Sequence, residues 1–168
     1  MCFHIFTTLF LCTVFSIIPS SFCRGNYKWV PAANGSIPEY TVRSGTDYGG
    51  GPLYAGRVKH DGDVIPAKIS TKIKYAYFSN NGYEYRHREY EALVSNDTAW
   101  KLSSGGGVPP EALIIGTKFD GEPVYMGRTL MEGTITPGKV DPQHRCLFVP
   151  YNGTERKFYT YEVLILLK

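Results

Sequence analysis

The stretch Pro52-Leu53-Tyr54-Ala55-Gly56-Arg57 decides the fold, because the chain contains it twice. A shift of 71 residues places it on Pro123-Val124-Tyr125-Met126-Gly127-Arg128. The same shift, without a gap, matches the following residues: Trp29 with Trp100, Gly45-Thr46 with Gly116-Thr117, Gly62 with Gly133, Pro66 with Pro137, Lys68 with Lys139, Asn81-Gly82 with Asn152-Gly153, and Tyr90-Glu91 with Tyr161-Glu162. Because most of these residues shape the backbone or fill a core, the chain is a tandem duplication of one fold unit.

The composition favours short strands joined by tight turns. With 43% hydrophobic residues, the 168-residue chain can form a core in one or two small domains. Its thirteen Tyr, eighteen Gly and eleven Pro suit strands and turns better than helices. The net charge is +3, and basic and acidic residues are interleaved, so no basic block indicates a nucleic acid partner.

Residues 1–23 are predicted to be a secretory signal peptide. They contain no Lys, Arg, Asp or Glu, and the apolar run 3–18 is shorter than the ~20 residues that span a bilayer. We therefore expect a secreted, extracellular protein without stable membrane insertion, although the missing basic residues leave a retained anchor as the alternative. Cleavage near Arg24 would leave Cys146 as the single cysteine, either buried and inert or in an intermolecular disulfide.

Two hairpins are predicted in the first copy. Strands 53–58 and 64–69 flank Asp61-Gly62, and strands 75–78 and 83–94 flank Asn81-Gly82; both dipeptides are typical of tight β turns. Residues 41–44 are expected to form a short strand, and the apolar residues 163–167 a strand buried on both faces. The prediction is an all-β, β-sandwich-like fold with pseudo-twofold symmetry, with strands either exchanged between the copies or kept within each.

The repeated motifs resemble the DM9 repeat family. They are Gly-x-x-x-x-x-x-Pro-x-Tyr-x-Gly-Arg, Gly-x-x-x-Pro-x-Lys and a closing Tyr-Glu-x-Leu, and with the preceding Trp they cover residues 29–165. The resemblance implies two DM9 repeats, residues 24–95 and 96–168, packed as one all-β pseudo-symmetric unit. Some members are mannose-binding lectins of invertebrate innate immunity, and the repeat also precedes a pore-forming module in certain fish venom toxins.

The resemblance also implies a sugar site at Asp47 and Lys68. In the mannose-binding members, an Asp at the position of Asp47 and the Lys of Pro-x-Lys hold the sugar. A carboxylate accepts hydrogen bonds from sugar hydroxyls and an ammonium donates to them. The second copy keeps Lys139, but Lys118 replaces the Asp, so Asp120 is the nearby acceptor and this site is expected to be weaker. The structural alternative is that both Lys end strands and Asp47 only shapes a turn.

Other repeated residues indicate structural roles or modification. Arg57 and Arg128 are expected to pair with Glu91 and Glu162, and Trp29 and Trp100 to belong to the core. N-glycosylation sequons stand at Asn34, Asn96 and Asn152, all in predicted loops or turns.

No pattern indicates an enzyme, a metal site or a cofactor. His60, His87 and His144 lack metal-ligand spacing, and neither a Gly-x-Ser-x-Gly elbow nor a phosphate-binding loop is present. The sequence favours a calcium-independent lectin for mannose-type glycans of microbial surfaces, with a homodimer left open. The alternative is a non-catalytic interaction module or effector that binds protein or membrane surfaces.

Overall fold

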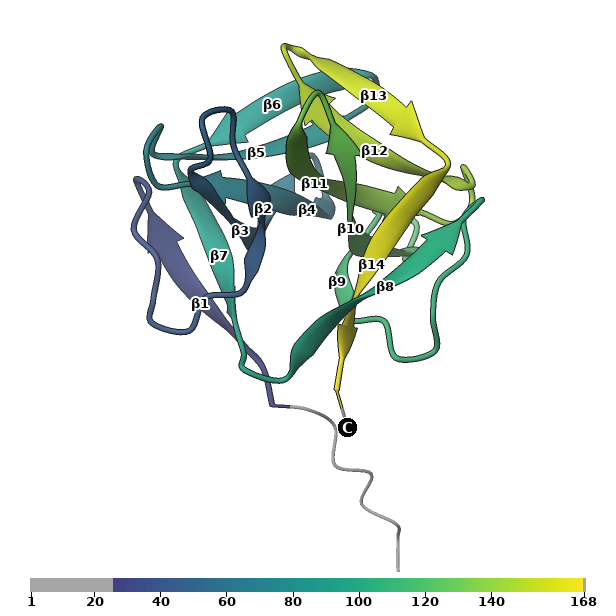
Figure 1. Cartoon of the computed structure of the whole chain (residues 1–168), viewed down its shortest axis with the longest axis horizontal. Coiled ribbons are helices and arrows are strands. Elements are labelled where there is room, and N and C mark those ends of the chain that lie inside the picture. Colours follow the sequence, from purple (N-terminus) through teal and green to yellow (C-terminus); the bar gives the residue numbers. More distant parts are fainter. Residues whose placement is uncertain (1–25, 168) are drawn as a thin grey trace, which may run out of the picture.

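A computed structural model gives the fold of residues 26–167, so the predicted signal peptide lies outside the described residues. The regular elements are fourteen strands (Figure 1): β1 (Lys28–Ala33), β2 (Arg43–Thr46), β3 (Pro52–His60), β4 (Asp63–Ser70), β5 (Tyr75–Asn80), β6 (Tyr83–His87), β7 (Glu89–Val94), β8 (Thr98–Ser104), β9 (Ile114–Thr117), β10 (Pro123–Met131), β11 (Thr134–Asp141), β12 (Cys146–Tyr151), β13 (Thr154–Phe158) and β14 (Thr160–Leu166). We call β1–β7 copy one and β8–β14 copy two. Among the described residues, no helix is long and apolar enough to cross a bilayer.

The strands form one antiparallel sheet with a symmetric order. That order is β1-β7-β3-β4-β5-β6-β13-β12-β11-β10-β14-β8, with β2 beside β3 and β9 beside β10. It is equivalent from both ends, so a pseudo-twofold axis passes between β6 and β13, where Tyr83 pairs with Thr154. The sheet curls so that its two edge strands, β1 and β8, lie at the lower left and lower right of Figure 1. The all-β, pseudo-twofold prediction is confirmed, and within residues 26–167 each copy pairs its own strands rather than exchanging them.

Both predicted hairpins form, but the strand predicted at 83–94 is wrong as a single element. Asp61-Gly62 and Asn81-Gly82 have positive φ at both residues, as type I′ turns require. The predicted strand is interrupted at Arg88, between the end of β6 and the start of β7. This break lets β6 reach copy two while β7 pairs with β1 and β3.

Two strand predictions need correction at their ends. The short strand expected at 41–44 is β2, which runs from Arg43 to Thr46 after an isolated bridge at Thr41. The predicted last strand, 163–167, is not buried on both faces throughout: Val163 and Leu164 are fully buried, but Ile165 and Leu166 are only partly buried. Leu167 is 45% exposed because the strand β14 ends at Leu166.

The two copies share a core. The central cluster contains residues of both copies: Val42, Ala55 and Leu93 of copy one and Leu113, Ile115, Met126 and Leu164 of copy two. Trp29 and Trp100 are only partly buried and pack against this cluster rather than inside it. Each tryptophan is covered by a guanidinium, with Arg57 Cζ 4.1 Å from the ring centroid of Trp29 and Arg128 Cζ 4.2 Å from that of Trp100.

Two glycines let the copies approach each other. A Cβ on Gly45 of β2 would overlap the carbonyl oxygen of Ile135, and a Cβ on Gly116 of β9 would overlap that of Val64. Each short strand therefore packs its backbone directly on a strand of the other copy, which explains why both positions hold glycine.

Candidate functional site

A pocket lies between the two copies and contains the predicted sugar-binding pair. Copy one contributes Asp47, Tyr48 and Lys68 to its lining, and copy two contributes Glu132 and Tyr151. The lining is completed by Leu53 and by three threonines, Thr46, Thr134 and Thr136. The wall from copy two was not expected from the sequence, which pointed to one rim built within copy one.

The loop between β2 and β3 fixes Asp47. The backbone N–H of Asp47 donates to Gly51 O at 2.7 Å, and Gly50 N donates to Asp47 O at 2.9 Å. Tyr48 N donates to the carboxylate Oδ1 of Asp47 at 2.8 Å. This bond uses one of about four acceptor positions of the carboxylate, so Asp47 retains the capacity to accept bonds from a ligand.

Lys68 on β4 reaches the same pocket from the sheet. Its Nζ donates to Pro150 O of copy two at 2.6 Å and lies 3.8 Å from Glu84 Oε1. Burial lowers the pKa of Lys68, while the negative charges of Glu84 and then Asp47 oppose that shift. An ammonium has three donors, so Lys68 can hold Pro150 O and still donate to a ligand.

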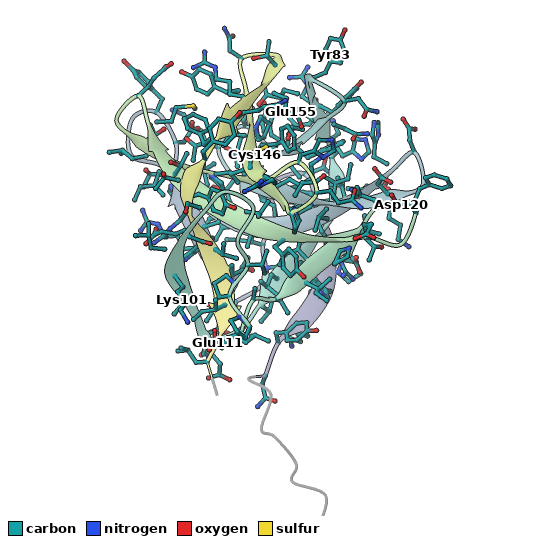
Figure 2. All side chains as sticks on the ribbon, turned by 90° about the vertical axis from the view of Figure 1, so that its right-hand side faces the viewer. Tyr83, Lys101, Glu111, Asp120, Cys146 and Glu155 are labelled. Carbon is teal, nitrogen blue, oxygen red and sulfur yellow. The ribbon has the colours of Figure 1, made fainter. Side chains whose placement is uncertain are left out.

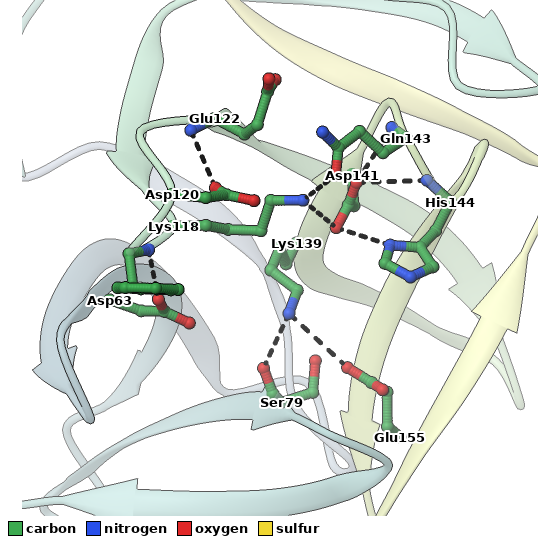
Figure 3. A network of polar contacts seen from close by, with 11 residues as sticks. Asp63, Ser79, Lys118, Asp120, Glu122, Lys139, Asp141, Gln143, His144 and Glu155 are labelled. Carbon is green, nitrogen blue, oxygen red and sulfur yellow. Dashed lines mark hydrogen bonds and ion pairs between the residues drawn. The ribbon is translucent and has the colours of Figure 1, made fainter.

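Lys139 repeats these contacts across the pseudo-twofold axis. Its Nζ donates to Ser79 O of copy one at 3.4 Å and lies 3.9 Å from Glu155 Oε1 (Figure 3). Lys139 itself is 7% exposed. Both lysines therefore lie largely buried within their strands and link the copies, so the alternative that they only end strands at the surface is wrong.

Two glutamates that the 71-residue shift relates, Glu84 and Glu155, complete these links. Glu84 Oε2 accepts from Gly153 N at 2.9 Å, and Glu155 Oε2 accepts from Gly82 N at 3.0 Å. Each glutamate thus holds the hairpin turn of the other copy and also faces the lysine of its own copy. Their recurrence at the 71-residue shift was the available signal.

In copy two, Lys118 of the loop between β9 and β10 binds partners away from Lys139. Lys118 Nζ lies 3.5 Å from Asp141 Oδ2 and also donates to Gln143 Oε1 (Figure 3). Asp120 Oδ1 accepts from Glu122 N at 3.1 Å within its own exposed turn, at the periphery of the molecule (Figure 2). The structure therefore brings Asp47 and Lys68 together, whereas it gives Lys139 and Asp120 separate partners.

Asp141 is the buried centre of the copy-two network. It accepts from His144 Nδ1 at 2.9 Å and from the backbone N–H groups of Gln143 and His144 at 3.0 and 3.2 Å. Burial alone would raise the pKa of Asp141, but the bonds from His144 and the charge of Lys118 hold this pKa below its ordinary value.

We expect Asp141→Ala to lower the free energy of unfolding at pH 7 by about 2–3 kcal/mol, because it removes the carboxylate partner of Lys118 and leaves two backbone N–H groups without their acceptor. Since the folded-state pKa is depressed, this contribution is present above pH ~4 and is lost as the pH falls through the folded pKa. Urea unfolding of wild type and variant from pH 7 to pH 2 measures it. Asp120→Ala, in an exposed turn, is the control, and a pH-independent difference would contradict the assignment.

The remaining predicted residues have clear places. Arg57 Nε lies 2.7 Å from Glu91 Oε2, and Arg128 Nε lies 2.7 Å from Glu162 Oε2, so both expected pairs form. The sequon residues Asn34, Asn96 and Asn152 are all exposed in turns or bends. Cys146 is buried on β12 (Figure 2), and burial raises the pKa of its thiol. Within residues 26–167, no group of three or more His, Cys, Asp or Glu is placed to hold a metal ion.

Comparisons with known proteins agree with the repeated motifs. The family model for the DM9 repeat matches residues 10–62 and 47–158. Natterin-4 of Thalassophryne nattereri is 27% identical over 146 residues, which are 84% of this chain and 34% of natterin-4. Natterin-1 of the same species is 26% identical over 149 residues, which are 85% of this chain and 39% of natterin-1. The chain therefore spans a little over a third of the length of these curated relatives.

The fold also resembles a solved structure. The crystal structure of the nematode sperm cell motility protein MFP2B superposes with a TM-score of 0.61 at 15% identity, over 90% of this chain and 50% of that one. At this identity the similarity concerns the fold alone. The DM9 model, in contrast, matches most of the chain, so this protein belongs to the DM9 repeat family.

Proposed function

We propose that the pocket between the copies binds a neutral carbohydrate, with Asp47 as acceptor and Lys68 as donor. The observation that carries this proposal is that both groups line one pocket while Lys68 forms its ion pair with Glu84 rather than with Asp47. A separated carboxylate and ammonium can bind neighbouring hydroxyls of one sugar, each of which donates and accepts. Tyr48, which is 83% exposed beside Asp47, offers an aromatic face for the C–H side of the ring.

The finer proposal is a secreted, non-catalytic lectin for mannose-type glycans, such as those of microbial surfaces. It is supported by the DM9 resemblance and by the match between the family's sugar-holding pair and the positions of Asp47 and Lys68. No cofactor or metal takes part in this proposal. A blank glycan array together with strong binding to a protein or membrane surface would favour the interaction-module alternative.

We expect Asp47→Ala to weaken binding of methyl α-mannoside about tenfold or more, because hydrogen bonds to a charged acceptor contribute about 1.5–3 kcal/mol each. Calorimetric titration of the secreted chain should find one dominant site per chain, since Lys118 of copy two is held by Asp141 and Gln143. Asp120→Ala is the matched control in the other loop and should change the affinity less. Two equal sites, or an unchanged affinity of Asp47→Ala, would refute this assignment.

A further inference from the structure

A second carboxylate, Glu132 of copy two, lines the same pocket as Asp47. It stands in the tight turn between β10 and β11, with a positive φ of 50°. Tyr151 OH donates to Glu132 Oε2 at 2.6 Å, and Arg156 Nη1 donates to Glu132 Oε1 at 2.7 Å. Arg156 Cζ also lies 4.4 Å from the ring centroid of Tyr151, so the three side chains form a closed triangle.

This triangle fixes Glu132 although it is on the surface. The side chains of Arg156 and Glu132 are 40% and 52% exposed, and ion pairs this exposed contribute little to stability. The hydrogen bonds from Tyr151 and then Arg156 lower the pKa of Glu132, which keeps it ionised. Each carboxylate oxygen uses one lone pair within the triangle and has a second lone pair for a ligand.

Aromatic side chains from both copies accompany this carboxylate. Tyr151 lines the pocket next to Glu132, and Tyr48 lines it from copy one. The hydrogen bond to Glu132 and burial raise the pKa of Tyr151, and Tyr48 is the last and smallest contributor to this shift. Two phenol rings and a fixed acceptor are the components that a sugar ring needs, beyond those supplied by Asp47 and Lys68.

The triangle has no equivalent in the other half of the molecule. The 71-residue shift places Glu132, Tyr151 and Arg156 on Asp61, Asn80 and Tyr85. There Asp61 lies 3.4 Å from His60, and the ring of Tyr85 packs against the rings of His60 and Phe78 instead. The triangle thus occurs once in the described chain, at the pocket that also has the complete Asp47 and Lys68 pair.

We propose that Glu132, oriented by Tyr151 and Arg156, forms a second sugar subsite that makes the pocket select neutral glycans of two or more units over single sugars. The inference rests on the proposed function, in which Asp47 and Lys68 hold the first sugar. Glu132 accepts hydrogen bonds from hydroxyls of the adjoining sugar unit, and the C–H face of that sugar lies on the phenol rings of Tyr48 and Tyr151. Two carboxylates in one pocket repel a glycan that carries its own carboxylate, which restricts the ligand to neutral chains.

Calorimetric titration with methyl α-mannoside and α-mannobiose tests this proposal. Wild type should bind the disaccharide about tenfold more tightly, the size of one hydrogen bond to a charged acceptor. Glu132→Gln should bind both sugars within about twofold of each other and keep the wild-type affinity for the monosaccharide. Tyr151→Phe, which frees Glu132 from one anchor, should retain part of the preference. Asp61→Asn, the matched change in the copy-one turn, should behave as wild type, and thermal unfolding verifies that each variant is folded.

The outcomes separate the two proposals. Equal affinities of wild type for the two sugars would overturn the second subsite and leave the first one standing. A loss of monosaccharide and disaccharide affinity by the same factor in Glu132→Gln would also overturn it, because Glu132 would then belong to the first subsite. Binding of neither sugar by folded wild type would overturn the proposed function itself.

Discussion

Gly116→Ala is expected to lower the free energy of unfolding by about 3–5 kcal/mol, which is more than most single substitutions cost. The added methyl group would overlap Val64 O, a backbone atom of β4 in the other copy, and would also meet the Val64 side chain. Backbone cannot rotate away as a side chain can, so β9 must separate from β4. Because Ile115, beside this glycine, belongs to the shared central core, the separation would open that core as well.

Urea unfolding measures this loss as a shift in midpoint at constant slope. The matched control is Gly51→Ala, where the nearest atom is Asp47 Cβ at 4.0 Å, and its effect should stay within about 0.5 kcal/mol. Both copies should unfold in a single cooperative transition, since residues of both copies form the central core. A variant that melts copy two first while copy one stays folded would show that the copies are independent units.

Much of the fold could be predicted because it depends on local chemistry. Asp61-Gly62 and Asn81-Gly82 fix two hairpins through their positive φ angles, and the duplication then extends this information to copy two. Arg57 and Glu91 lie on neighbouring strands, β3 and β7, so repetition of both residues was enough to pair them. The Asp47 and Lys68 pair followed from the family motif.

The rest could not be predicted because it depends on contacts between the copies. Glu132 and Tyr151 line the pocket from copy two, far along the chain from Asp47 and Lys68. The 71-residue shift places them on Asp61 and Asn80, which gave no sign of a shared pocket. The partner of Lys68 is the backbone carbonyl of Pro150. Every residue has a backbone carbonyl, so the sequence gives no signal of this contact. The interruption between β6 and β7 at Arg88 is not marked by a glycine or a proline. It arises from tertiary contacts, because β6 pairs with β13 whereas β7 pairs with β1.

Lys68→Met is expected to weaken binding of methyl α-mannoside about a hundredfold, because it removes the cationic donor and leaves Glu84 without its partner ammonium at the pocket. The chain should still fold. Met fills a similar volume, and Glu84 Oε2 still accepts from Gly153 N. The lost link to Pro150 O should cost about 1–3 kcal/mol of stability.

The symmetry of the molecule supplies the control for this experiment, Lys139→Met. Lys139 makes the same kind of links to the other copy, to Ser79 O and Glu155, but its counterpart loop presents Lys118 rather than an aspartate. Both variants should therefore lose similar stability in urea unfolding, whereas only Lys68→Met should lose sugar affinity in titration. Equal losses of affinity would mean that the two lysines act only as links between the copies, since a shared structural defect predicts the same result for both. If the two variants are equally stable but only Lys68→Met loses sugar affinity, the difference measures the direct contribution of Lys68 to sugar binding.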